Sequence, residues 1–130
     1  MSRADPAEQA VLRLEARRFA SRCDAQIALV QRADTLRELS RLSRISIPYR
    51  LSEDFFSRDA QRHVTVAAEQ RAREIIQEQI QHFIRAEPEQ QEKLKHQTVE
   101  DWANLSGALG HLRVWAQGKL LAAQQVRPLY

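Results

Sequence analysis

Apolar residues recur along most of the chain at alternating steps of three and four positions, the spacing that places side chains on one face of an α-helix. A first series comprises Leu12, Ala16, Phe19, Cys23, Ile27 and Val30. A second, longer series comprises Ala60, Val64, Ala68, Ala72, Ile76, Ile80 and Phe83. Alternation of the kind that predicts a β-strand lasts only a few residues at any point. The pattern therefore predicts an all-α protein.

Capping residues and prolines divide this pattern into helices. Asp5 and Pro6 suit the start of the first helix, and Pro48 forces the preceding residue out of the helical conformation. Ser52 is a capping residue for the long middle helix, and Pro88 interrupts the pattern after it. We predict helices at about 6–33, 35–45, 53–86, 88–96 and 99–125. They form a single domain, residues 1–130, built as a bundle of three long helices plus one or two short ones.

All three glycines of the chain fall within the last predicted helix, where each costs about 1 kcal/mol relative to alanine. They lie on a stripe of mostly small residues. A second, separate stripe is predicted to face the core and comprises Trp102, Leu105, Leu109, Leu112, Ala116 and Ala123. A helix with two such faces packs on both sides, so the small face contacts either another helix of the same chain or a partner subunit. Packing inside the bundle is the commoner use of such a face. Trp102 and Trp115 lie on different faces, which speaks for a partner, because tryptophan is enriched at interface centres. The predicted protein interface comprises Ala103, Gly107, Gly110, Val114, Trp115 and Gly118.

Charge is distributed unevenly along the chain. Residues 1–50 hold ten arginines and six acids, residues 51–100 seven bases and ten acids, and residues 101–130 three bases and one acid. The basic first half is expected to face acidic residues 74–92 of a neighbouring subunit, or nucleic acid. With one cysteine, no apolar signal region and no apolar run of membrane-spanning length, the chain is expected to be cytoplasmic.

Four arginines are candidate contacts to nucleic acid or to an acidic partner. Arg37, Arg41 and Arg44 share one helical face, and Arg50 follows in the next loop. Aromatic residues that stack on bases are scarce in these stretches, and acids such as Glu38 are interleaved. A solvated face with local salt bridges is therefore the favoured interpretation of this pattern.

The chain shows no arrangement typical of an active site. The histidines, His63, His82, His96 and His111, are scattered, and none belongs to a metal-binding helix motif. Cys23 lies on the apolar seam of the first helix, which suits a buried, inert thiol. No loop has the glycines of a phosphate-binding motif. We predict a protein that is not an enzyme and has no catalytic residue, metal, cofactor or small-molecule substrate.

The stretch DWANLSGALGHLRVW, residues 101–115, resembles a motif of small helical proteins encoded by tailed bacteriophages. In those proteins an acid–aromatic pair, a leucine, a glycine and a GxLRxx run recur near the C-terminus. The resemblance implies a phage origin and a role in virion assembly or as a helper protein, and it transfers no catalytic residue.

The predicted function is thus a non-enzymatic interaction protein that self-associates or docks on a larger phage assembly, in the host cytoplasm or in the virion. The alternative is a small, arginine-rich protein that binds nucleic acid or regulates the host. Neither function involves a membrane.

Overall fold

A computed structural model describes residues 5–125. Within this range the chain forms five α-helices, two short 3₁₀ turns and no strand, which confirms the all-α fold. The elements are α1 (Pro6–Arg32), α2 (Leu36–Leu42), η1 (Tyr49–Leu51), α3 (Phe55–Arg85), α4 (Pro88–Trp102), η2 (Gly107–Leu109) and α5 (Leu112–Gln125). None of the described helices is both long enough and apolar enough to cross a membrane.

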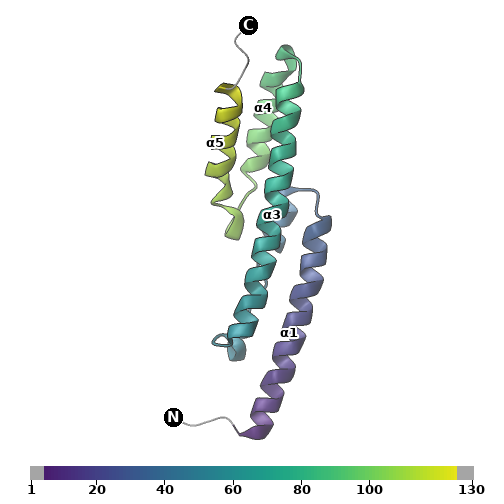
Figure 1. Cartoon of the computed structure of the whole chain (residues 1–130), viewed down its shortest axis with the longest axis vertical. Helices are drawn as coiled ribbons and strands as arrows, with labels where there is room; N and C mark the ends of the chain where they lie inside the picture. The colour runs from purple at the N-terminus through teal and green to yellow at the C-terminus, as the bar shows by residue number, and fades with distance from the viewer. Residues whose placement is uncertain (1–4, 126–130) are drawn as a thin grey trace.

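The molecule is an elongated bundle organised around α3, which contacts all four other α-helices. Helix α1 lies beside the first half of α3, and α4 and α5 pack on its second half (Figure 1). Helices α1 and α3 run in the same direction, because Glu15 meets Arg50 just before α3 begins and Ala33 meets Arg71 further along it. The chain must therefore travel back between them, and α2, residues 43–48 and η1 provide that return.

The extended part of the return, residues 43–48, obtains its backbone partners from side chains on both flanking helices. On α1, Gln26 donates to the carbonyls of Leu42 and Arg44 at 2.9 and 3.2 Å. On α3, Gln61 accepts from the Ile45 amide at 2.7 Å, and Thr65 donates to the Ser43 carbonyl at 2.7 Å. Polar backbone groups outside a helix need such partners when they are buried. These bonds hold the returning segment between the two helices.

Buried side chains form two clusters at different heights along α3. The lower cluster, between α1, η1 and the start of α3, comprises Phe19, Cys23, Leu51 and Val64. The upper cluster lies between the end of α1, α2, the second half of α3, α4 and α5. Its largest fully buried members are Trp102, Leu39, Ile76, Leu105, Leu109, Leu112 and Val30.

The predicted limits of the two longest helices are nearly right. Helix α1 begins after Asp5, whose carboxylate accepts from the Glu8 amide at 2.8 Å as predicted. Helix α3 begins two residues later than predicted, because Asp54 rather than Ser52 caps it by accepting from the Ser57 amide. The predicted helix 35–45 is shorter, since α2 ends at Leu42 and residues 44–48 belong to no helix.

The prediction of one helix over residues 99–125 is wrong. Helix α4 continues through the predicted boundary at Thr98 to Trp102, and residues 103–111 form a corner before α5. Gly107 has φ +56°, a left-handed conformation that interrupts any helix and that other residues adopt only at a cost. Arg113 stabilises the corner by donating to the carbonyls of Leu105 and Ala103 at 2.7 and 3.3 Å. The glycines therefore do not form a stripe along one helix.

Replacing Gly107 with alanine should lower the free energy of unfolding by about 1–2 kcal/mol, the cost of placing a Cβ in the left-handed region. The matched control is Gly110→Ala in the same corner. Gly110 has φ −56°, and an added Cβ would make only an ordinary contact, 3.5 Å from the Gly107 carbonyl. Urea denaturation should show no destabilisation for this control. Equal losses for both variants would contradict the role assigned to Gly107.

Candidate functional site

Titratable side chains of the described residues do not assemble into a metal-binding cluster. Among residues 5–125 no group of three or more His, Cys, Asp and Glu side chains is placed to hold a metal ion. Three histidines instead lie 3.7–3.8 Å from single carboxylates, in the pairs His63–Asp59, His96–Glu100 and His111–Glu69. All three histidines are exposed.

Cys23 lies inside the lower cluster, as its position on the apolar seam predicts. Burial raises the pKa of its thiol, Asp24 raises it further, and Arg22 opposes them. The thiolate is the reactive form of cysteine, so a raised pKa keeps this thiol protonated and weakly nucleophilic at neutral pH.

The six predicted interface residues do not share one helical face. Ala103 ends α4, Gly107 and Gly110 belong to the corner, and only the remaining three lie on α5. Gly118 is exposed, and a Cβ added there would meet no atom within 4 Å, so no other helix among residues 5–125 approaches it closely. Close backbone packing, the reason for which the stripe was predicted, does not occur within the chain at this position.

One side of α5 is nevertheless apolar and uncovered. Val114 is 77% exposed and Leu121 is 56% exposed, and Gly118 lies between them at helical spacing. Together these three residues form the α5 face. Trp115 is only half-buried against the upper cluster, with Arg73 and Lys119 positioned 5.6 and 5.9 Å from its ring centroid. It is therefore held partly by contacts within its own chain.

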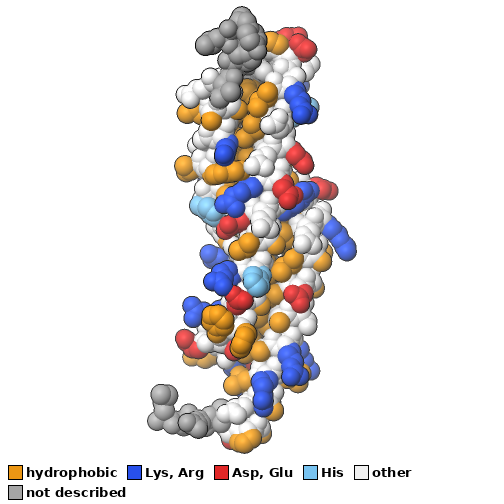
Figure 2. Space-filling model, in the orientation of Figure 1, with side chains coloured by type: hydrophobic (Ala, Val, Ile, Leu, Met, Phe, Trp, Pro, Cys, Tyr) orange, Lys and Arg blue, Asp and Glu red, His pale blue; other side chains and the backbone are white. Residues whose placement is uncertain are grey.

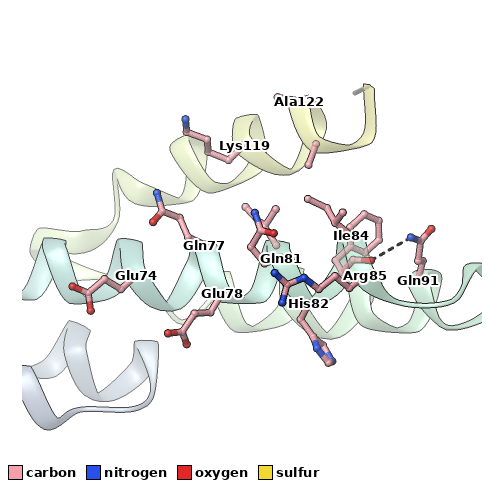
Figure 3. Close-up of a pocket in the computed structure, with 13 residues that line it drawn as sticks. Glu74, Gln77, Glu78, Gln81, His82, Ile84, Arg85, Gln91, Lys119 and Ala122 are labelled. Atoms are coloured by element: carbon pink, nitrogen blue, oxygen red, sulfur yellow. Dashed lines mark hydrogen bonds between the residues drawn. The ribbon is translucent and has the colours of Figure 1, made fainter. Parts of the chain in front are cut away.

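An open groove of about 1230 Å³ runs between α3 and α5, beside the α5 face. Gln77, Gln81 and Ile84 point from α3 toward α5 (Figure 3). From the opposite side, Lys119 and Ala122 line the groove. Ile84 is 46% exposed and gives the α3 side of the groove an apolar side chain.

The structure does not bring the four predicted arginines together. Arg37 donates to the side-chain oxygen of Asn104 at 3.1 Å, near the α4–α5 corner. Arg50 lies at the far end of the returning segment and pairs with Glu15 at 3.0 Å. Arg41 and Arg44 are exposed, and α2 ends before Arg44. The helix predicted to carry Arg37, Arg41 and Arg44 on one face therefore ends before Arg44.

Three aromatic side chains are exposed near the start of α3, although the sequence indicated that aromatic residues are scarce beside the arginines. Tyr49 is 92% exposed, and Phe55 and Phe56 are 69% and 77% exposed, with ring centroids 5.7 Å apart. Figure 2 shows hydrophobic side chains low on the molecule, over the start of α3, with Lys and Arg side chains beside them. The sequence does contain one indication that the two phenylalanines are exposed. Both come before Ala60, the first residue of the apolar series that faces the core.

No family model, curated protein or solved structure matches this chain. The stretch that resembles the bacteriophage motif has a clear structural role. Its buried members are Trp102, Leu105, Leu109 and Leu112, and its first glycine and its arginine shape the turn. The pattern of residues 101–115 thus encodes the corner between α4 and α5, and the candidate functional surfaces lie outside most of it.

Proposed function

We propose that this protein is a non-enzymatic assembly protein that pairs with a second copy through the α5 face and the adjoining groove. The observation that carries the proposal is the exposed apolar pair Val114 and Leu121 on α5, with an open groove beside the same helix, neither of which any described part of the chain covers. Exposed apolar surface beside a groove is typical of protein interaction sites.

A second copy suits this surface because a two-fold pair makes every contact twice. Val114 and Leu121 of each copy would be buried in the interface. Full burial of one such side chain contributes about 1.5–3 kcal/mol to the free energy of association. Gly118 was predicted to let another helix approach closely. In this proposal that helix belongs to the second copy and not to the same chain.

Charges beside the groove also suit self-pairing. Lys119 on α5 and Glu78 on α3 both line the groove, and neither forms an ion pair within the described chain. In a two-fold arrangement Lys119 of one copy can approach Glu78 of the other, giving two opposite-charge contacts. Such complementarity fixes orientation more than it adds affinity.

The resemblance of residues 101–115 to small helical phage proteins supports placing this assembly in a tailed bacteriophage. In this proposal the pair acts in virion assembly, in the host cytoplasm or as a part of the particle.

Light scattering at two protein concentrations tests the proposed pairing. The wild-type protein should approach twice its chain mass of 15.1 kDa at the higher concentration. Val114→Glu with Leu121→Glu should give a 15.1 kDa monomer with unchanged helical circular dichroism, because the charges would be buried in the pair. The matched control is Val11→Glu with Leu14→Glu, two comparably apolar and exposed positions on α1.

The control should associate as the wild type does. A wild-type protein that stays monomeric at both concentrations would contradict self-pairing. Equal dissociation of both double variants would show that general surface charge, rather than the α5 face, determines the mass.

A further inference from the structure

Six exposed arginines from three separate segments lie along one side of the lower half of the molecule. They are Arg18 and Arg22 on α1, Arg44 and Arg50 on the return, and Arg58 and Arg62 on α3. We propose that this arginine flank binds single-stranded nucleic acid, with phosphates on the arginines and bases on the neighbouring aromatic rings.

The α1 members are placed by contacts to the return. Gln26 bonds the carbonyls at the start of the returning segment, and Glu15 pairs with Arg50 at its end. Arg22 and Arg18 lie one and two turns before Gln26 on the same side of α1, between those two contacts. The span from residue 15 to residue 26 is about 16 Å at 1.5 Å per helical residue.

The α3 members are placed in the same way from the other side. Gln61 and Thr65 bond the returning segment, and each has an arginine three residues earlier, Arg58 and Arg62. Residues three apart are neighbours on a helix surface, so these arginines border the return from α3. Arg44 lies between the two helices because its carbonyl accepts from Gln26 while the next amide bonds Gln61.

Most of this positive charge has no partner among the residues that the structure describes. Arg50 pairs with Glu15 and Arg62 with Asp59, whereas the other four have no ion pair or hydrogen bond to any described side chain. Glu53 and Asp54 lie in the turn before α3, where the Asp54 carboxylate is engaged by Ser57. Unpaired guanidinium groups on a stretch of this length match a phosphate backbone, whose oxygens they bind in a fixed geometry.

Aromatic rings favour a single strand over a duplex. Tyr49 adjoins Arg50 and is the most exposed of the large apolar and aromatic side chains of residues 5–125. Phe55 is exposed at the start of α3, one turn before Arg58. Unpaired bases stack on such rings, whereas paired bases in a duplex present only their edges.

Fluorescence anisotropy with a labelled 20-nucleotide oligo(dT) tests the proposal. The wild-type protein should bind at 20 mM salt. If the four unpaired arginines contact phosphates, log affinity should fall with log salt at a slope of about −2.8, or about 600-fold between 20 and 200 mM. Arg22→Glu with Arg44→Glu should weaken binding at least tenfold at 20 mM and reduce the slope by about 1.4.

The matched control is Arg13→Glu with Arg17→Glu. Both residues are exposed and lack ion-pair partners among the described residues, and they lie on the other side of α1, so the net charge changes equally. This control should retain most of the affinity. Tyr49→Ala should weaken binding about tenfold, and Tyr49→Phe, which keeps the ring, should restore it.

Four outcomes would overturn the proposal. These are no binding of oligo(dT) at 20 mM salt, equal losses in the two double arginine variants, equal affinity for a duplex of the same length, or preferential binding to phosphatidylserine vesicles. A drop in native mass of Arg22→Glu with Arg44→Glu, without loss of oligo(dT) binding, would instead assign the flank to acidic residues 74–92 of a second copy.

Discussion

Replacing Trp102 with alanine should lower the free energy of unfolding by about 3–5 kcal/mol, the range for truncating a large aromatic side chain in a core. Trp102 is 1% exposed and belongs to the upper cluster. Its indole N–H donates to Gln79 at 2.9 Å, and Gln79 in turn donates to Asp101 at 2.9 Å. The substitution therefore leaves a cavity and also removes one bond from a partly buried amide. Urea denaturation followed by circular dichroism measures the loss.

Trp115 provides the matched control for this experiment. It is the other tryptophan of the chain, it is only half-buried, and two cations lie near its ring. Trp115→Ala should cost less than half as much as Trp102→Ala, because less of the ring is buried and solvent can fill its place. Equal losses would mean that α5 packs on the bundle more tightly than the burial of Trp115 indicates.

The two longest helices were predictable because their signals are local. The apolar seam of α1 repeats at helical spacing, and Asp5 and Pro6 mark its start. Helix α3 shows the same periodicity over 31 residues. Periodicity and capping depend on neighbours within one or two turns, so these signals are readable from the sequence.

The corner between α4 and α5 was not predictable in this way. Leu105, Leu109 and Leu112 are spaced as on one helix, and all three are buried, yet they belong to a turn, η2 and the start of α5. The left-handed φ of Gly107 breaks the helix, and a glycine in a sequence does not reveal the sign of its φ. The positions of the buried residues were thus right while the backbone joining them was wrong.

The arginine flank also could not be predicted from local sequence patterns. Its members come from three segments that meet only because α1 and α3 run parallel and the chain returns between them. The sequence grouped Arg37, Arg41 and Arg44 by helical spacing, but Arg37 is directed to Asn104 and Arg44 lies outside the helix. Surfaces assembled from distant segments require the tertiary arrangement.

The two proposed surfaces lie toward opposite ends of the long axis. The α5 face and its groove lie on the second half of α3, and the arginine flank borders the first half of α3. A pair formed through α5 does not require either arginine flank to be covered. Each proposal can fail without the other, because their tests alter residues on different elements.

Replacing Phe19 with alanine should cost about 3–5 kcal/mol and should shift the unfolding of the whole chain, including the half that Phe19 does not touch. Phe19 is 1% exposed in the lower cluster, while both tryptophans lie in the upper half. Because α3 is a single helix through both clusters, we expect one cooperative transition, as predicted for a single domain. Tryptophan fluorescence and circular dichroism should then move together to lower urea concentration. Leu14→Ala, an exposed position on the same helix, should change the stability by less than about 0.5 kcal/mol. If fluorescence keeps its wild-type midpoint while circular dichroism gains an earlier transition, the lower cluster unfolds separately and the chain contains two cooperative units joined by α3.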